Sequence, residues 1–393
     1  MIPKLREEFN SKFNEEAYNN FLIALDSGLK YPTDFRVSET PVFLSTEFSN
    51  ELQKACSEII SQIRTPDFIK RSKNAVPSSL FVPNEDEHPL FLQIDFAICE
   101  DGNGGFIPQL IELQGFPSLY CFQAYFADVI RNYFKIPSNF TSYFSGYDFH
   151  SYVNLLKEVI LAGNNPENVI LLEIEPEKQK TRIDFAATEK YVGIKPVCIT
   201  KVIKKGKQLF YNDNRREIQI KRIYNRVIFD ELIRKEIKYN FNFNDDLDIS
   251  WAGHPNWFFR ISKFSLPLLK NKYSPSCFFL SELNQYPVDL NNYVLKPLFS
   301  FAGSGVEVDV TKELLDSIKD RSNYILQKKI EYAPLIITPD GYSKVEIRMM
   351  FLWKNEPVLV NNLIRMSKGK MMGVDFNKNK TWVGSSVAFH PVD

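Results

Sequence analysis

The feature that most constrains the fold is an alternation of apolar and helical patterns from about residue 166 to residue 235. The run NVILLEI, residues 168–174, is apolar almost throughout, which is typical of a strand buried on both faces of a parallel sheet. The segment KTRIDFAATEKYVG then has a helical pattern that ends at Gly193, and KPVCITKV follows as a second buried strand. This order predicts a parallel α/β unit. The unit lacks a GxGxxG turn, so it does not indicate a dinucleotide site.

Antiparallel strands and helices are predicted on both sides of this unit. The apolar runs at residues 90–98 and 106–115 are joined by the turn sequence EDGNGG, which predicts a hairpin. Residues 52–63 have apolar side chains at helical spacing, and the segment after Pro117 also reads as a helix. Further strands are predicted over NYVLKPLF, YILQKKIEY, KVEIRMMFLW and EPVLVNNLIRM, and further helices over KRIYNRVIFDELIRKEI, ISKFSLPLLKN and TKELLDSIKDR. The expected class is therefore α+β with an α/β subdomain.

A length of 393 residues suggests two or three domains. We expect a largely helical first part at residues 1–165, a parallel α/β domain at 166–250, and a third part at 251–393. Lys+Arg and Asp+Glu both number 48, so the zero net charge gives no case for nucleic-acid binding. No apolar run approaches 18 residues and the start has no secretory signal, so we expect a cytoplasmic protein that does not span a membrane. Five scattered cysteines without a CxxC pair argue against a disulfide framework.

The segment KPLFSFAGSGV combines a strand lysine with a loop of small residues. Lys296 ends the strand, and Gly303 and Gly305 can bring backbone N–H groups close to phosphate oxygens because they have no Cβ atom. The lysine precedes the glycines, so the segment is not a P-loop. An ordinary hairpin with a surface lysine is the alternative.

The strand YILQKKIE ends in a polar segment before Pro334. Its last residues, among them Gln327, can offer backbone groups and an apolar wall to a flat base, although a plain amphipathic strand is the alternative. Downstream, alternation places Glu346 and Arg348 on one face of a strand. Arg348 and Arg365 together suit an anionic transferring group, and a cross-strand salt-bridge patch is the alternative.

Two carboxylates lie inside the apolar strands of the predicted early hairpin. Asp95 belongs to the first strand, and Glu112 alternates with Gln114 onto one face of the second. A carboxylate in apolar surroundings is costly unless it is paired or bound to a cation, and oxygen ligands from neighbouring strands suit Mg²⁺. Solvent-facing positions of a half-buried hairpin are the alternative.

These motifs, in this order, resemble the ATP-grasp superfamily. VLKPLFSFAGSGV is similar to its lysine strand and glycine loop, and RISKFSLPLL to the segment with an earlier ATP-contacting lysine. YILQKKI resembles its adenine-holding strand, and EIRMMFLW the strand whose arginine meets the transferring phosphate. IDFAICEDGNGGFIPQLIELQGFPSLY is similar to the metal-binding segment of glutathionylspermidine synthetase, whose ATP-grasp order is circularly permuted, as it is in eukaryotic glutathione synthetase. IKRIYNRVIFDEL also resembles a segment of such proteins, so the likeness covers residues 90–125 and 165–393 in patches.

The resemblance implies a circularly permuted ATP-grasp fold, in which antiparallel sheets enclose ATP. It assigns the metal-binding part of the core to residues 1–165, a substrate domain to residues 166–250, and the ATP-grasp lid and core to residues 251–393. It places Mg²⁺ at Asp95, Glu112 and Gln114. It places ATP at Lys263, Lys296, Ser300, Gly303, Ser304, Gly305, Gln327, Lys328 and Ile330. It gives Arg348 and Arg365 the catalytic contact with the transferring phosphate. Two departures stand out, because Gln114 replaces an asparagine, and Gln93 stands where the synthetase has an arginine near the acyl transfer.

The implied activity is an ATP-dependent carboxylate–amine or carboxylate–thiol ligation through an acyl phosphate. Its substrates would be a small-molecule carboxylate and an amine. An ATP-grasp phosphotransferase and a degenerate nucleotide-binding or scaffold protein without turnover are the alternatives, and the two glutamines favour the latter slightly. Arg222 and Arg226 would belong to the α/β unit and read an anionic substrate, or else be surface arginines that flank a strand.

Overall fold

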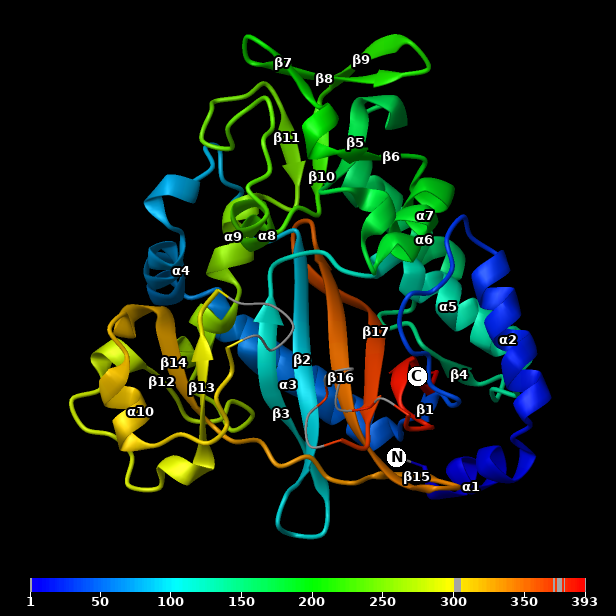
Figure 1. Ribbon diagram of the computed structural model, residues 1–393. Coiled ribbons are helices and arrows are strands. Elements are labelled where there is room, and N and C mark those ends of the chain that lie inside the picture. The colour runs from blue at the N-terminus through cyan, green and yellow to red at the C-terminus, as the bar shows by residue number, and fades with distance from the viewer. Residues whose placement is uncertain (1, 300–304, 370–371, 373–376, 378, 393) are drawn as a thin grey trace.

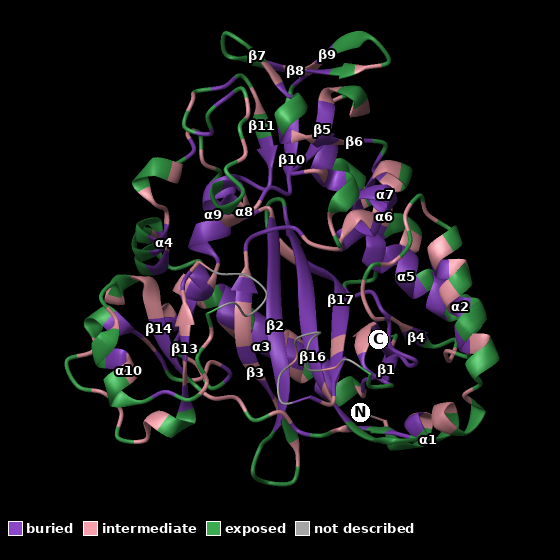
Figure 2. Ribbon diagram, in the orientation of Figure 1, coloured by how far each residue is buried: buried purple, intermediate pink, exposed green. Residues whose placement is uncertain are grey.

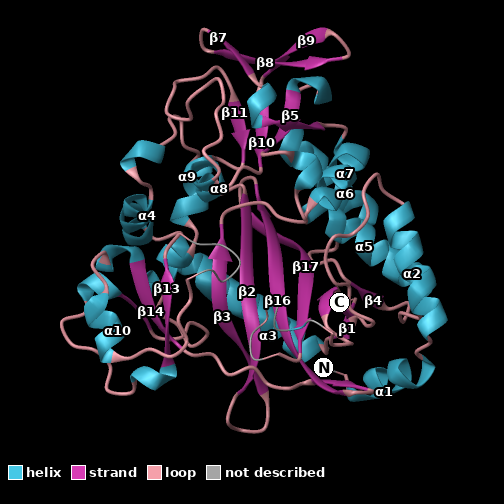
Figure 3. Ribbon diagram, viewed as in Figure 1, coloured by secondary structure: helices cyan, strands magenta, loops and turns pink. Residues whose placement is uncertain are grey.

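The computed structural model describes residues 2–299, 305–369, 372, 377 and 379–392. Helices and strands are mixed along the chain, as expected for the α+β class (Figure 3). Figure 1 shows a large sheet at the centre, a parallel sheet above it, and a small sheet beside its β3 edge. Among the described residues, no helix is both long enough and apolar enough to cross a bilayer.

The large sheet has the strand order β18-β17-β16-β2-β3, and β15 pairs with β16 outside this path. Its strands are β2 (Phe91–Glu100), β3 (Phe106–Gln114), β15 (Ile336–Thr338), β16 (Gly341–Trp353), β17 (Pro357–Ser367) and β18 (Gly384–Ser386). All its pairings are antiparallel. The predicted hairpin is confirmed, and its turn is held by Asp101, whose carboxylate accepts from the backbone N–H of Asn103 and Gly105 at 2.8 Å each. Strands from the beginning and the end of the chain thus meet at the β2–β16 pair.

One face of the large sheet is apolar and packs on α3 (Thr46–Ile63). This helix begins at Ser45, whose side chain accepts from the N–H of Phe48, and its apolar stripe has the predicted helical spacing. Leu52 and Ile59 from the helix join Ile94 and Ile347 from the strands in one buried cluster. Figure 2 shows how continuously the central strands are buried. The residues at the alternate strand positions therefore face away from α3.

The predicted parallel unit is confirmed as a sheet of order β11-β10-β5-β6. Its strands are β5 (Val169–Glu173), β6 (Lys195–Cys198), β10 (Arg222–Asn225) and β11 (Ser250–Ala252). The helices α5 (Tyr120–Tyr133), α6 (Phe149–Leu161) and α7 (Arg182–Val192) share an apolar cluster with Val169 and Leu171. Ile170 and Leu172 belong to a cluster on the other face, so β5 is buried on both sides as its sequence predicts.

The small sheet has the order β12-β14-β13 and is antiparallel. It consists of β12 (Cys277–Phe279), β13 (Tyr293–Pro297) and β14 (Tyr324–Lys328), and α10 (Lys312–Ser317) lies beside it. Leu295 and Leu326 pack with Leu315 of α10 on one face. On the other face, Cys277 and Ile325 join the cluster that also contains residues of the large sheet. The small sheet thus has one face toward α10 and one toward the large sheet.

Further helices and strands flank these three sheets. They are α1 (Pro3–Lys12), α2 (Glu15–Ser27), β1 (Val42–Phe43), α4 (Pro66–Ser72), β4 (Phe140–Thr141), β7 (Ile203–Lys205), β8 (Gln208–Asp213), β9 (Arg216–Ile220), α8 (Phe229–Arg234), α9 (Pro255–Arg260) and β19 (Ala388–Pro391). β19 lies between β1 and β4, which joins the two ends of the chain.

Three sequence-based elements are wrong in part. The predicted α-helix over residues 261–271 is a 3₁₀ helix, Lys263–Leu268, because in an α-helix the Pro267 ring would clash with the carbonyl four residues earlier. The predicted strand at residues 195–202 ends at Cys198 and is followed by a 3₁₀ turn. The segment KRIYNRVIFDEL begins with strand β10 before α8 starts at Phe229. The large sheet takes strands from both the first and the third proposed domain. The division of the chain into three domains stays a prediction.

Candidate functional site

Polar side chains cross the large sheet in a row on the face away from α3. The register pairs Glu112 of β3 with Asp95 of β2, and Asp95 with Arg348 of β16. Gln114 pairs with Gln93 in the neighbouring row. Directly paired residues of antiparallel strands point to the same face. The sheet therefore brings the early hairpin and the late arginine together, although 253 residues separate Asp95 from Arg348.

Asp95 is the centre of an ion-pair network. Its side chain is fully buried, and both oxygens accept from Arg348, with Nε to Oδ1 at 2.7 Å and Nη2 to Oδ2 at 2.6 Å. Arg365 of β17 donates from Nη2 to Oδ2 at 3.1 Å. Two guanidinium groups thus share one carboxylate, and the contact with Arg348 is bidentate. Both oxygens of Asp95 serve arginines in this arrangement, and its role as a metal ligand stays a prediction.

Glu346 extends the same network. Arg365 pairs with Glu346 Oε1 through Nη2, and Tyr332 donates from Oη to Oε2 at 3.1 Å. Burial raises the pKa of Glu346, and the charge of Arg365 opposes this shift. Sequence reasoning missed Tyr332, although it lies in the polar segment after β14. The structure shows the cross-strand salt-bridge patch that the sequence left as an alternative, and the phosphate contact of Arg348 and Arg365 stays a prediction.

Two lysines approach the row from outside the large sheet. Lys263 comes from the 3₁₀ helix and Lys296 from β13. Burial lowers the pKa of both lysines, and the nearby charge of Glu112 opposes the shift in both. Within the described part of the chain, neither Lys296 nor Glu112 makes a hydrogen bond or an ion pair through its side chain. A half-buried cation and a half-buried carboxylate thus face the same region.

Glu112, Gln114 and Lys263 line a small cavity of about 30 Å³, which Leu298 and Phe299 also border. The oxygens of Glu112 and Gln114 have no side-chain hydrogen bond to another described residue. A carboxylate and an amide oxygen are the hard ligands that Mg²⁺ accepts, so these two residues fit the predicted metal. Among the described residues, no group of three or more His, Cys, Asp or Glu side chains gathers as a metal site. A metal ion here would therefore need further oxygen ligands, such as those of a phosphate or water.

Gln327 lies on the face of the small sheet that looks toward the large sheet. It pairs with Cys277 and Val294, and it follows Ile325, which pairs with Lys296. Its side chain is 1% exposed, and neither amide atom has a hydrogen-bond partner in the described part of the chain. A buried amide without a partner is costly, so this position is typical of a site that a ligand completes.

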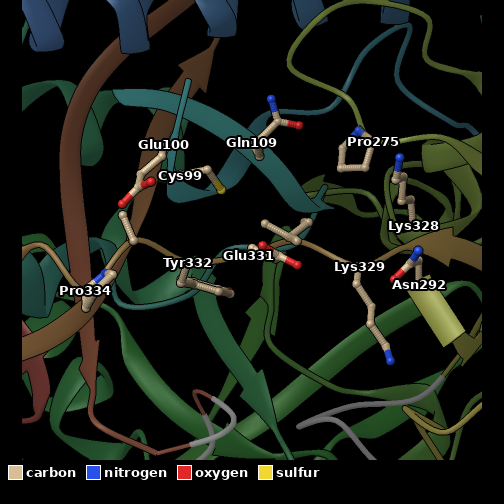
Figure 4. A pocket seen from close by; sticks show the side chains of 12 residues that line it. Cys99, Glu100, Gln109, Pro275, Asn292, Lys328, Lys329, Glu331, Tyr332 and Pro334 are labelled. Atoms are coloured by element: carbon tan, nitrogen blue, oxygen red, sulfur yellow. The ribbon is translucent and has the colours of Figure 1, made fainter. Parts of the chain in front are cut away.

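Lys328 and Ile330 line a larger cavity of about 630 Å³ at the end of β14 (Figure 4). Cys99 and Gln109 from the early hairpin also line this cavity, and Figure 4 shows Cys99 and Tyr332 on one side of it and Lys328 on the other. The end of β14 and the hairpin thus enclose a space next to the ion-pair network. The predicted contact of Lys328 and Ile330 with a nucleotide base stays a prediction.

The glycine loop is only partly within the structure. Ser300, Gly303 and Ser304 lie outside the described residues. Gly305 has a φ of 71°, in the left-handed region that favours glycine. A Cβ atom at this position would come within 3.1 Å of Pro297 Cγ. Another side chain here would be strained.

The two arginines of the α/β unit differ in their surroundings. Arg222 donates from Nε to the carbonyl of Ile160 at 2.9 Å and from Nη1 to Ser250 Oγ at 3.0 Å, so it ties α6 to the sheet. Arg226 is 4% exposed and lies 4.7 Å from the ring centroid of Phe116. Its Nε and Nη1 atoms are buried and have no hydrogen-bond partner among the described residues. Arg226 is therefore a buried cation with unused donors, whereas Arg222 is structural.

Glu173 is a further buried carboxylate near Arg226 that sequence reasoning missed. Burial raises its pKa to about 8, and the charge of Arg226 opposes the shift. The residue closes β5 at the carboxyl edge of the parallel sheet, where ligands of open α/β sheets bind. A charged residue at the end of the apolar run NVILLE is the signal that could have identified it.

No protein-family model matches this chain, and no curated protein matches it. Among solved structures, the chain is similar to the apo form of a glutathione synthetase-like effector, GSS30, from Globodera pallida. The TM-score is 0.55, the sequence identity is 11%, and the match covers 96% of each chain. The mixed α+β fold with antiparallel sheets is thus of the glutathione synthetase-like type over nearly the whole chain.

Proposed function

We propose that this protein is an ATP-dependent ligase that joins a carboxylate to an amine or a thiol through an acyl phosphate. One observation carries the proposal: Lys263 and Lys296 from outside the large sheet and Glu112 from its edge strand face one region between the two sheets. This is the charge pattern that a nucleotide triphosphate with a divalent cation requires. The glutathione synthetase-like fold supports it. We further propose that the fold is a circularly permuted ATP-grasp, since the acidic strands precede the lysine strand.

In this proposal, the nucleotide lies between the small sheet and the β3 edge of the large sheet. The base would enter the cavity beside Lys328 and Ile330. The buried amide of Gln327 would contact the nucleotide from the face of β14 that looks toward the large sheet. Lys296 and Lys263 would hold the phosphates. Glu112 and Gln114 would hold Mg²⁺, which would offset the negative charge of the phosphates.

The chemistry has two steps. An oxygen of the substrate carboxylate attacks the γ-phosphorus while the bond to the bridging oxygen of ADP breaks, which gives an acyl phosphate. The amine or thiol then attacks the acyl carbon, loses a proton, and inorganic phosphate leaves. Arg348 and Arg365 would stabilise the transferring phosphoryl group, and Asp95 and Glu346 hold these arginines in place.

A nucleotide-binding protein without turnover is the second candidate. Two observations favour it. Gln93 stands where the synthetases that the sequence resembles have an arginine, and both oxygens of Asp95 accept hydrogen bonds from arginines instead of facing a metal site. A phosphotransferase would use the same nucleotide site without a second nucleophile. The three functions predict different requirements for ADP formation.

The experiment combines a thermal shift with an ADP assay on the full chain. Millimolar ATP with Mg²⁺ should stabilise the protein, because a ligand at 100 times its Kd adds about 2.7 kcal/mol. Repeated turnover with release of inorganic phosphate should then require both a carboxylate and an amine or thiol, because the carboxylate alone supports only the first step. Repeated ADP formation with one acceptor and without release of inorganic phosphate indicates a phosphotransferase, and stabilisation without ADP formation indicates a binding protein. No stabilisation at millimolar ATP contradicts all three.

A further inference from the structure

A third cavity, of about 400 Å³, lies over β16, β17 and β18, on the same face of the large sheet as the ion-pair network. We propose that this cavity binds the acyl substrate, and that this substrate is a carboxylic acid with an apolar body and no charged amino group. The inference rests on the proposed function for the role of the ligand as acyl donor. The binding itself follows from the chemistry of the cavity.

The cavity contains two guanidinium groups with unused donors. Arg348 spends Nε and Nη2 on Asp95, and all hydrogen bonds of Arg365 come from Nη2. Nη1 of Arg348 and the Nε and Nη1 of Arg365 therefore have no hydrogen-bond acceptor among the described residues. The Arg365 side chain is 42% exposed. Because Asp95 and Glu346 fix the two groups, the spare N–H donors are already oriented for a small anion.

The walls around these donors are mainly apolar. They include Phe35, Leu119, Leu363, Met366 and Val383. A hydrocarbon body is favoured there over water because its burial removes apolar surface from solvent. No aspartate or glutamate is among the described residues that line the cavity, whereas Arg36 and Lys380 are. The four basic residues of this described lining disfavour an ammonium group on the ligand, so an apolar acid without an amino group fits better than an amino acid.

The position of the cavity suits an acyl donor. Arg348 lies two strands from Glu112 along the row that also contains Asp95. With about 4.8 Å between neighbouring strands, the backbones of Arg348 and Glu112 are about 10 Å apart. A carboxylate bound to the arginines would thus lie beside the proposed triphosphate site, with its apolar body directed away from it.

The test is calorimetric binding of 3-phenylpropanoate to the full chain without nucleotide. Its alcohol analogue, 3-phenylpropan-1-ol, and glutamate serve as comparison ligands. The acid should bind at least about tenfold more tightly than either, because charged hydrogen bonds form only with the carboxylate and apolar contacts only with the phenyl body. Equal affinity for the acid and the alcohol would overturn the anion site, and tighter binding of glutamate would overturn the apolar class.

Two variants locate the binding site. Arg365→Gln should weaken the acid about tenfold and leave the alcohol unchanged, whereas Phe35→Ser should weaken both ligands. Arg64→Gln is the matched control, because Arg64 is 45% exposed and pairs with Glu356 on the surface, away from the cavity. An unchanged acid affinity in Arg365→Gln would overturn the assignment. Acid binding in a protein that does not bind ATP would contradict the proposed function but not this site.

Discussion

The pairing of Asp95 with Arg348 gives the sharpest prediction about the large sheet. We expect Arg348→Met to destabilise the protein, because methionine fills the space of the arginine stem but leaves a fully buried carboxylate with one weaker partner. Removing one member of a buried ion pair costs about 3–5 kcal/mol. Arg365 still donates to Asp95 at 3.1 Å, so we expect the lower end of this range.

The expected change in Tm follows from the size of the chain. At about 2.1 cal/mol/K per residue, unfolding of 393 residues has an entropy of about 0.8 kcal/mol/K, so a loss of about 3 kcal/mol lowers the Tm by about 4 °C. Differential scanning calorimetry measures this shift. The double variant Asp95→Asn with Arg348→Met should recover more than half of it, because no unpaired charge remains. An Arg348→Met protein within 1 °C of the wild type, or a double variant less stable than the single one, would refute the reasoning.

Two further predictions concern carboxylates with different partners. Glu112→Gln should weaken ATP binding with Mg²⁺ about tenfold or more and leave binding without metal equal or tighter, because the repulsion of the phosphates is removed. Isothermal titration with and without Mg²⁺ measures both affinities, and a parallel loss would contradict a metal role. Glu173 has its pKa raised from 4.5 to about 8 in the folded protein, so the fold binds an extra proton between these values and loses stability as pH rises from 4.5 through 8. Glu173→Gln should flatten this slope and be more stable than the wild type at pH 8.5 in denaturant titrations, whereas an unchanged slope would exclude Glu173 as its cause.

Local sequence patterns predict much of the fold. The hairpin of β2 and β3 follows from two apolar runs around EDGNGG, and the parallel sheet follows from the doubly apolar run of β5. The period of two also placed Glu112 and Gln114 on one face of their strand, and Glu346 and Arg348 on one face of theirs. These inferences depend on neighbours along the chain, so the sequence contains the information they need.

The pairing of strands that lie far apart in the sequence could not be predicted from local patterns. The register that sets Arg348 against Asp95 depends on how β16 docks on β2, and no local pattern specifies it. The sequence therefore left open whether Arg348 meets a phosphate or a carboxylate. Tyr332 and Glu173 were missed because their roles arise from burial by distant elements. The unpaired amide of Gln327 is likewise visible only once the two sheets are placed together.

The most direct test of the central claim is the ATP affinity of Lys296→Ala, measured by calorimetry with Mg²⁺. The claim is that the lysine of the small sheet and the acidic edge of the large sheet hold a single triphosphate. We expect the Kd to rise about 10- to 100-fold, the range for a charged hydrogen bond to phosphate, with the Tm of the free protein little changed. Lys312→Ala, on α10 at the opposite face of the small sheet, should bind ATP as the wild type does. Equal ATP affinity in Lys296→Ala and Lys312→Ala would contradict the account.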